Sequence, residues 1–233
     1  MLTLRKASDR FHTQIDWLDS WHSFSFGEHH DPRHMGFGPL RVINDDRITG
    51  GGGFPTHGHR DMEIITIVLT GVLEHKDSLG NGSRIRPGDV QKMSAGLGIL
   101  HSEFNANADI PVHLLQIWIT PSVMGIAPSY QQIHFDADRL QNKFCLIASH
   151  SGAEESVLLH QDARILMADI ATGETLHYRP EKGRKAWVQL AGGNIEVNQI
   201  ALNEGDGLAV EQEMALAFCA SAQSKVLLFD LDG

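Results

Sequence analysis

The chain has 233 residues, which suits one large domain or two small ones and is too long for a miniprotein held by disulfides. Apolar residues make up 42% and charged residues 21%, so the chain can bury a hydrophobic core. Its 19 Lys and Arg and 29 Asp and Glu give a formal net charge of -10, which argues against direct nucleic acid binding through a basic surface.

The two cysteines and the N-terminus indicate the compartment. Cys145 and Cys219 have no CxxC spacing, so neither a disulfide framework nor a cysteine zinc site is expected. The N-terminus lacks the apolar stretch of a signal peptide, and no run approaches the roughly 18 apolar residues of a membrane span. We therefore expect a cytoplasmic protein that does not associate with membranes.

Short β-branched runs alternate with turn residues along the chain. Residues 63–70 and 112–120 are rich in Val, Ile, Leu and Thr and have the length of strands. The pair Asn81-Gly82 predicts a hairpin. A short helix is expected near residues 129–132 or 137–141. Helical periodicity is otherwise almost absent, which predicts an all-β barrel or sandwich.

A weak internal repeat divides the chain. Gly71 aligns with Gly192, and the turn Gly88-Asp89 aligns with Gly205-Asp206. Two copies of one β-unit predict two similar barrels. We expect the break between them in the polar stretch of residues 121–142.

Histidine is concentrated in the first half, where 10 of the 14 lie at or before position 113. His57 and His59 are two residues apart, as are His101 and Glu103, so each pair would point to one face of a strand. If the two strands are neighbours in a barrel, the four side chains converge. Three imidazoles and one carboxylate suit Fe(II), Mn, Co, Ni or Cu(II) and leave up to two octahedral positions open.

Two further residues could face the same cavity. Glu63 follows His57 by six residues, so it could replace Glu103 as the carboxylate ligand, or accept a hydrogen bond from a ligand imidazole. His75 lies at an even spacing from Gly71, but we interpret it as a solvated strand histidine. His29, His30 and His34 lie in a Gly- and Pro-rich segment; they could edge the mouth of the pocket, but we expect this segment to form a surface loop.

Several segments resemble, in order, signatures of the pirin family of the cupin superfamily. They are residues 23–27, 38–46, 57–63, 73–81 and 93–105. The resemblance is specific from about residue 20 to 130 and general beyond. It implies an all-β bicupin, in which two β-barrels of the double-stranded β-helix or jelly-roll type pack together. Residues 1–130 would form a metal-binding N-terminal barrel, and residues 131–233 a shorter C-terminal barrel without metal ligands.

The resemblance also implies a ligand set and an ion. By resemblance the ligands are His57, His59, His101 and Glu103. The ion would be one divalent transition metal, with iron(II) expected first and Mn, Co, Ni, Cu or Zn as alternatives. Alignment of the two halves places four other residues opposite these ligands in the second barrel, namely Tyr178, Pro180, Phe218 and Ala220.

The activity implied by the resemblance is that of a quercetin 2,3-dioxygenase. This mononuclear metal-dependent enzyme opens the central ring of a flavonol with dioxygen and releases carbon monoxide. Glu103 is the first candidate, and Glu63 the second, for the carboxylate that takes the proton of the substrate's 3-hydroxyl.

Two alternatives remain open at this point. One is a metal-bound sensor or protein-interaction module of the pirin type with incidental quercetinase activity. The other is a cupin isomerase or a different dioxygenase. An enclosed apolar cavity beside the metal would favour an enzyme, and a flat exposed surface would favour an interaction module.

Overall fold

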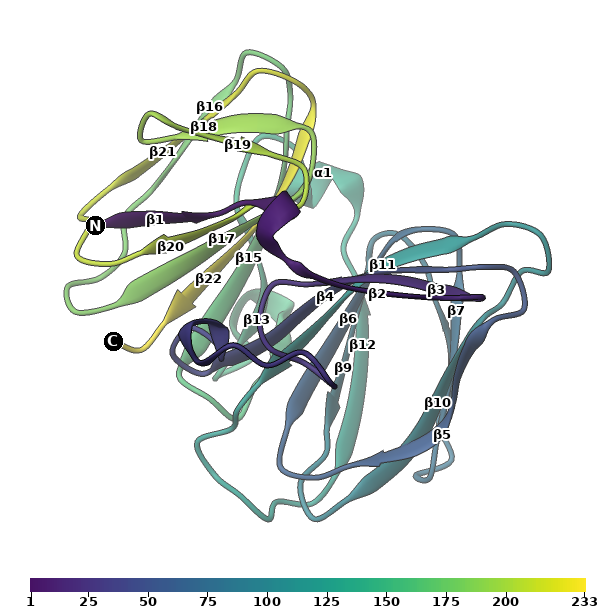
Figure 1. Cartoon of the computed structure of the whole chain (residues 1–233). Coiled ribbons are helices and arrows are strands. Elements are labelled where there is room, and N and C mark those ends of the chain that lie inside the picture. Colours follow the sequence, from purple (N-terminus) through teal and green to yellow (C-terminus); the bar gives the residue numbers. More distant parts are fainter. The chain divides into compact units, whose positions relative to one another are not determined.

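The computed structural model describes all 233 residues, which form two compact units (Figure 1). The N-terminal unit comprises Phe11–His134 and Val157–Gln161. The C-terminal unit comprises Met1–Arg10, Phe135–Ser156 and Asp162–Gly233. Two short segments therefore belong with the other half of the chain, whereas the resemblance implied a single division near residue 130.

Two antiparallel sheets build the N-terminal unit. The strands of the larger sheet are β2 (Phe11–Ile15), β3 (Leu18–His22), β4 (Leu40–Ile48), β6 (Glu63–Thr70), β9 (Asp89–Ser94), β11 (Val112–Ile119) and β12 (Ser129–His134). Those of the smaller sheet are β5 (Gly53–His59), β7 (Leu73–Asp77), β8 (Gly82–Ile85) and β10 (Ile99–Asn105). The unit also contains the short strand β14 (Val157–Leu158) and a 3-10 turn at Pro32–His34.

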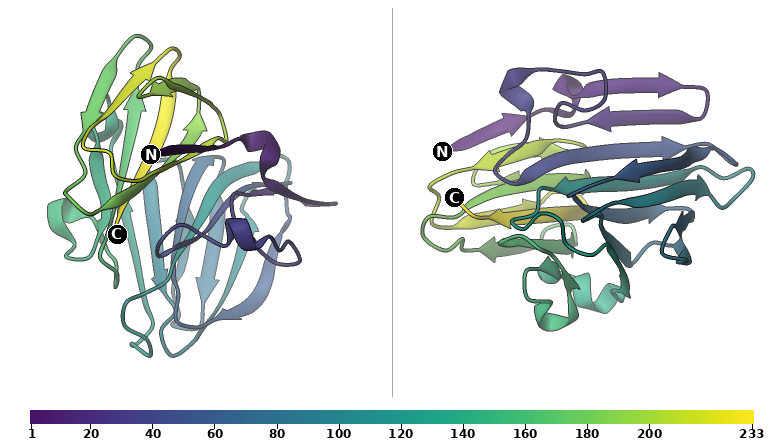
Figure 2. Two further views of the ribbon diagram at one scale, coloured as in Figure 1. Left: turned by 60° about the vertical axis from the view of Figure 1, so that its left-hand side comes forward. Right: turned by 90° about the horizontal axis from the view of Figure 1, so that it is seen from below.

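The most apolar strands lie in the middle of the larger sheet. The order is β12-β9-β6-β11-β4-β3-β2 in the larger sheet and β5-β10-β7-β8 in the smaller one. The two strands predicted at residues 63–70 and 112–120 are β6 and β11, which pair near the centre of the larger sheet. Figure 2 shows the β2–β3 hairpin at the opposite end of this order from β12. The prediction of a mostly β chain is confirmed.

The predicted hairpin and one short helix are present in the structure. The hairpin at Asn81-Gly82 joins β7 to β8, and Gly80 adopts a left-handed backbone there, with φ of +88°. Of the two places considered for a short helix, residues 129–132 are not helical: they lie in β12, which pairs with β9 from Ser129 to His134. The second forms the short helix α1, Ala137–Leu140.

The C-terminal unit is also made of two antiparallel sheets. The larger contains β1 (Leu2–Arg5), β13 (Cys145–Ser149), β15 (Ala163–Ile170), β17 (Lys185–Gly192), β20 (Gly207–Val210) and β22 (Ser224–Leu231). The smaller contains β16 (Thr175–Tyr178), β18 (Asn194–Val197), β19 (Ile200–Asn203) and β21 (Leu216–Ala220). Two 3-10 turns, Ala7–Asp9 and Ala153–Glu155, and helix α1 complete it.

A hydrophobic core joins the two sheets of the C-terminal unit. Its buried members come from both sheets and include Val188 and Leu228 of the larger sheet and Val197 and Phe218 of the smaller one.

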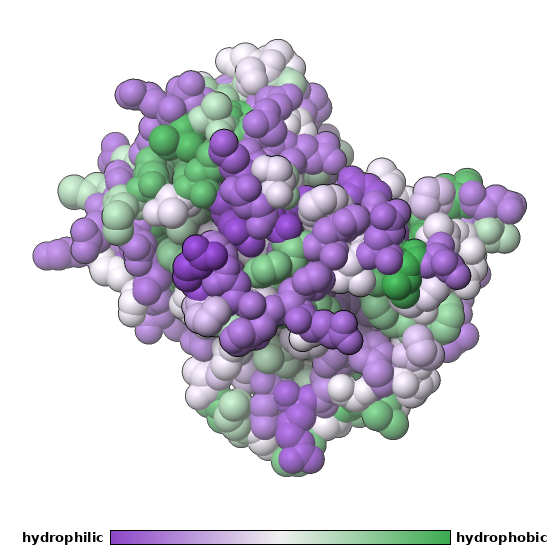
Figure 3. All heavy atoms as spheres, viewed as in Figure 1, coloured by the Kyte–Doolittle hydropathy of each residue, from purple (hydrophilic) through white to green (hydrophobic).

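Figure 3 shows one face of the molecule, on which hydrophilic side chains predominate and hydrophobic ones form small groups between them. No helix is long and apolar enough to cross a membrane.

The two units repeat one topology. The order β20-β17-β22-β15 in the C-terminal unit repeats β9-β6-β11-β4, and β16-β21-β18-β19 repeats β5-β10-β7-β8. The predicted repeat is therefore confirmed, but its register at Gly71 differs by one residue. Gly71 and Gly193 both have positive φ, of +81° and +84°. A Cβ on Gly71 would collide with the backbone at the start of β11, and one on Gly193 with the backbone at the start of β22. Gly193, not Gly192, is the counterpart of Gly71.

This register corrects part of the alignment between the halves. His57 pairs with His101 across β5 and β10, and Tyr178 pairs with Leu216 across β16 and β21. The counterparts of His101 and Glu103 are therefore Leu216 and Phe218, whereas the alignment from sequence gave Phe218 and Ala220. The second repeat is too short between its turns for sequence alone to fix the register of β21.

Candidate metal centre

Three histidines converge on two neighbouring strands of the N-terminal unit. His57 and His59 lie on β5, and His101 lies opposite His57 on β10. One ring nitrogen from each of the three lies within 4.8 Å of those of the other two. The ring centroids of His57 and His101 are 4.4 Å apart, and those of His59 and His101 are 4.9 Å apart. The alternation of the strands thus brings the predicted histidines together.

Glu103 lies in a second group that shares His101. Its carboxylate oxygen, a nitrogen of His101 and a nitrogen of His75 all lie within 4.8 Å of one another. The β5–β10 pairing is irregular between His101 and Glu103, while Glu103 lies opposite His75 on β7. The interpretation of His75 as a solvated histidine was wrong, because the residue is fully buried.

Several buried ring nitrogens of this cluster have no hydrogen-bond partner. They are His59 Nε2, His75 Nδ1 and both nitrogens of His101. A buried polar atom without a partner is costly, and such atoms are rare in folded proteins. Nδ1 of His57 is 2.8 Å from the carbonyl oxygen of Pro55, an arrangement that leaves Nε2 available. The donor set therefore fits a divalent transition metal.

Burial keeps two of these imidazoles neutral. It lowers the pKa of His59 to about 4, assisted by the nearby His57. It lowers the pKa of His101 to about 3, with smaller contributions from the neighbouring histidines. Neutral imidazole is the form that binds metal ions, so both side chains are ready to act as ligands at neutral pH.

Two side chains of the larger sheet hold the carboxylate of Glu103. Gln116 Nε2 donates to Glu103 Oε2 at 2.7 Å, and Thr66 Oγ1 donates to Oε1 at 3.4 Å. Trp118 Nε1 donates to Gln116 Oε1 at 3.1 Å, which turns the amide nitrogen of Gln116 toward Glu103. Burial raises the pKa of Glu103 above its ordinary value, although these donors and the nearby histidines oppose the shift.

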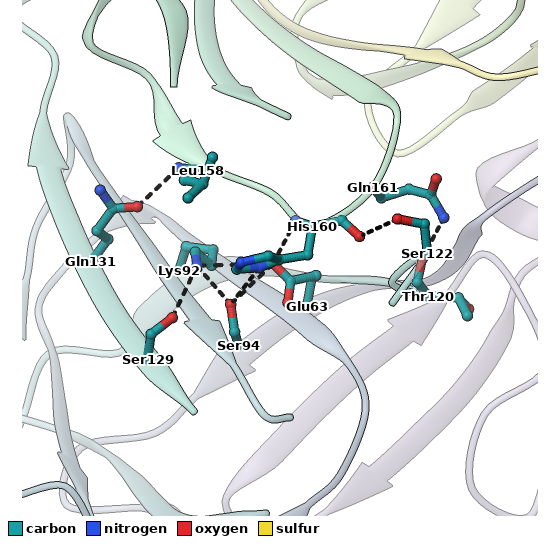
Figure 4. A network of polar contacts seen from close by, with 10 residues as sticks. All are labelled: Glu63, Lys92, Ser94, Thr120, Ser122, Ser129, Gln131, Leu158, His160 and Gln161. Atoms are coloured by element: carbon teal, nitrogen blue, oxygen red, sulfur yellow. Dashed lines mark hydrogen bonds and ion pairs between the residues drawn. The ribbon is translucent and has the colours of Figure 1, made fainter. Parts of the chain in front are cut away.

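Glu63 lies in a different network (Figure 4). Its Oε2 accepts a hydrogen bond from Ser94 Oγ at 3.1 Å and from the backbone nitrogen of His160 at 3.2 Å. Lys92 Nζ lies 3.8 Å from the same oxygen. Even spacing does not carry from His57 to Glu63, because β5 ends at His59 and β6 of the other sheet begins at Glu63. The structure therefore does not bring Glu63 to the histidine cluster.

A cavity of about 720 Å³ opens beside the cluster. Its wall includes His57, His59 and Glu103 together with the aromatic rings of Phe26, Phe54 and Trp118. The Trp118 ring stands edge-on to His59, with centroids 4.8 Å apart. A largely apolar cavity with a few converging polar groups is typical of a small-molecule site.

The cavity has polar residues that sequence reasoning missed. Asp46 on β4 and His22 on β3 line it. His29, which we expected in a surface loop with the mouth of the pocket as the alternative, also lines it. Burial raises the pKa of Asp46 to about 7, against a hydrogen bond from Ser20 that lowers it. Asp46 and Gln116 could have been found from the sequence, because each is a polar residue within a strand that begins and ends with apolar residues.

Both halves of the chain match known families. Residues 4–119 match the family described as Pirin, and residues 146–231 match the one described as Quercetinase C-terminal cupin domain. These matches support the cupin-type, all-β fold class expected from the sequence.

Similar proteins cover almost the whole chain. A quercetin 2,3-dioxygenase of Escherichia coli strain K12 is 46% identical over 231 residues, covering 99% of both chains. A pirin-like protein of Caulobacter vibrioides is 41% identical, covering 92% of both. The crystal structure of the bacterial pirin YhhW of Escherichia coli in complex with nickel(II) superposes with a TM-score of 0.95 at 44% identity, covering 100% of this chain and 99% of that one. The chain therefore belongs to the pirin family.

Proposed function

We propose that the protein is a flavonol 2,3-dioxygenase, which opens the central ring of flavonols such as quercetin with dioxygen and releases carbon monoxide. One observation carries the proposal: buried imidazole nitrogens without partners lie beside a cavity lined by aromatic rings. The relative of Escherichia coli that bears the name quercetin 2,3-dioxygenase, at 46% identity, supports the same substrate class.

One divalent transition metal would be held by His57, His59, His101 and Glu103. When bound, the ion would act as a Lewis acid that lowers the pKa of the flavonol 3-hydroxyl. Iron(II) is our first proposal, and nickel(II), present in the related YhhW structure, is the first alternative. Manganese, cobalt, copper and zinc are further alternatives for the same donors.

Glu103 would take the proton of the 3-hydroxyl. Burial raises its pKa, which makes the carboxylate a stronger base than an exposed glutamate. Its Oε2 is engaged by Gln116 at 2.7 Å, while Oε1 has only the 3.4 Å contact from Thr66. Oε1 is therefore the oxygen that would receive the proton. Glu63 takes no part in this step, because its Oε2 is engaged by Ser94 and His160.

The cavity walls would bind and orient the flat, aromatic flavonol. Phe26, Phe54 and Trp118 provide ring faces and edges for a planar ligand, and Phe26 stands edge-on to Trp118 with centroids 5.4 Å apart. Filling the cavity would also exclude water from Glu103. A hollow of this volume lined largely by apolar side chains favours this enzyme over an interaction module that uses a flat surface.

The C-terminal unit would have a structural role and hold no metal. Its residues at the positions of the four proposed ligands are Tyr178, Pro180, Leu216 and Phe218, which offer neither imidazole nor carboxylate. Phe218 and Leu216 are instead part of the hydrophobic core of that unit. Apolar packing has taken the place of coordination there.

The test compares stripped and reloaded protein. Metal is removed with a chelator, restored with iron(II) or nickel(II), and counted by elemental analysis, while quercetin loss is followed by absorbance. We expect one ion per chain and activity that follows the bound ion. His101→Gln should lose both ion and activity, whereas His113→Gln, which removes a histidine bonded to Asp45 at 2.7 Å, should lose neither. Full activity in stripped protein would refute the proposal.

A further inference from the structure

His75 has the surroundings of a metal ligand, although sequence reasoning assigned it to the solvent. Its side chain is fully buried, and its Nδ1 has no hydrogen-bond partner. A nitrogen of His75 lies within 4.8 Å of a nitrogen of His101 and an oxygen of Glu103. Donors about 2.1 Å from one ion lie at most about 4.2 Å apart, so this group needs only a small contraction to coordinate.

The other nitrogen of His75 is bound to a buried carboxylate. Nε2 lies 3.2 Å from Asp77 Oδ2, and both side chains are fully buried. Asp77 also accepts hydrogen bonds from the backbone nitrogens of Leu79 and Asn81, at 2.9 and 3.0 Å. The carboxylate is thus fixed as an acceptor, so Nε2 carries a proton and donates it. Metal-binding histidines usually have such a carboxylate on the nitrogen that faces away from the ion.

We propose that His75 binds the metal ion through Nδ1, in an inner position that it forms with His101 and Glu103. This proposal rests on the proposed metal centre and adds a donor to it. The outer group has three imidazoles, whereas the inner group has two imidazoles and one carboxylate. The latter is the donor set of many non-haem iron(II) oxygenases, which leaves the remaining positions open. Because the groups share His101, one ion has two available positions.

The inner position is the more enclosed of the two. His57 and His59 line the cavity, but His75 and His101 do not. The ring of His75 packs beside that of Tyr130, with centroids 5.1 Å apart. This contact explains why the ring is buried, but it gives Nδ1 no hydrogen-bond partner. An ion at the inner position would satisfy this nitrogen and leave the cavity side of the centre to substrate and dioxygen.

Two variants of the full chain test the proposal. His75→Gln retains a donor for Asp77 but lacks the second nitrogen. Asp77→Asn leaves His75 in place, changes the group on its Nε2 and keeps an oxygen that can accept from the backbone nitrogens of Leu79 and Asn81. His113→Gln is the matched control, because His113 also pairs with an aspartate in this unit and lies in neither ligand group. The probes are nickel(II), whose affinity is measured by chelator competition, and copper(II), whose imidazole ligands are counted by pulsed electron paramagnetic resonance.

We expect His75→Gln to weaken nickel(II) binding by about tenfold or more, as for other losses of metal-site residues, and to remove one imidazole from the copper(II) spectrum. Asp77→Asn should alter the quadrupole coupling of one remote ring nitrogen. If His75→Gln fails to fold, the Asp77→Asn spectrum decides. Affinities and spectra equal to those of His113→Gln would overturn the proposal for His75 alone. A wild-type protein that binds neither ion would overturn the metal centre as well.

Discussion

Gln116 donates a hydrogen bond of 2.7 Å to Glu103, the one carboxylate in the candidate ligand set. The amide is itself oriented by Trp118, whose indole nitrogen lies 3.1 Å from Gln116 Oε1. Gln116 lies opposite Thr66, the second donor to Glu103, on the neighbouring strand. The larger sheet thus positions a side chain of the smaller one.

This arrangement predicts the effect of Gln116→Leu. Loss of the donor leaves Oε2 of Glu103 buried without its partner, which should weaken metal binding and activity by about tenfold or more. Metal affinity and quercetin turnover are the measurements. Gln189→Leu is the matched control. Gln189 is a buried glutamine of the C-terminal unit and, like Gln116, accepts a hydrogen bond from the indole nitrogen of a nearby tryptophan, here Trp187. Equal effects of the two substitutions on metal affinity would refute the positioning role.

The two candidate carboxylates should separate in their effects. Glu103→Gln should lose metal and activity. Glu63→Gln should keep the ion but leave Lys92 buried without its counter-charge, which destabilises the protein by about 3 kcal/mol or more. Denaturant unfolding and metal analysis of both variants distinguish these results.

A double variant controls for the charge. Adding Lys92→Met to Glu63→Gln removes both members of the buried pair and should restore much of the stability lost in the single variant. Loss of metal from Glu63→Gln equal to that from Glu103→Gln would contradict the separation seen in the structure.

The lowered pKa values of His59 and His101 predict a pH dependence for the metal-free protein. Their ordinary pKa is 6.5, and burial lowers it to about 4 for His59 and about 3 for His101. The unfolded chain therefore binds more protons below pH 6.5, so these residues make the folded state less stable as the pH falls toward 4. Ring signals of both residues, followed by nuclear magnetic resonance, should not titrate between pH 5 and 8. A midpoint near 6.5 for either would contradict the lowered pKa values.

The aromatic wall predicts an effect on substrate binding. Phe26→Ala removes a ring that lines the cavity and packs edge-on against Trp118, so we expect a KM for quercetin raised by about tenfold and a smaller change in kcat. Phe104→Ala removes a half-exposed ring of β10 that does not line the cavity. In steady-state kinetics, the KM of this second variant for quercetin should be close to that of the wild type. An equal rise of KM in both variants would argue against the proposed binding wall.

Local pattern predicted the convergence of the three histidines but left the carboxylate open and misassigned His75. His57, His59 and His101 could be found because alternation along a strand sets direction, and their strands are neighbours. Glu63 could not be separated from Glu103 without knowing that β5 ends at His59. His75 was missed because its burial depends on the pairing of β7 with β10, which no local spacing encodes. Gly192 was chosen over Gly193 because only the backbone angles distinguish them.

Isotope labelling of the products tests the proposed reaction most directly. The metal-loaded protein is given quercetin under dioxygen labelled with oxygen-18, and the ring-opened product and the released gas are analysed by mass spectrometry. A dioxygenase that cleaves the central ring should place both labelled atoms in the ring-opened ester and release unlabelled carbon monoxide, one molecule for each quercetin consumed. A product with one labelled atom or none, or turnover without carbon monoxide, would contradict the proposed function.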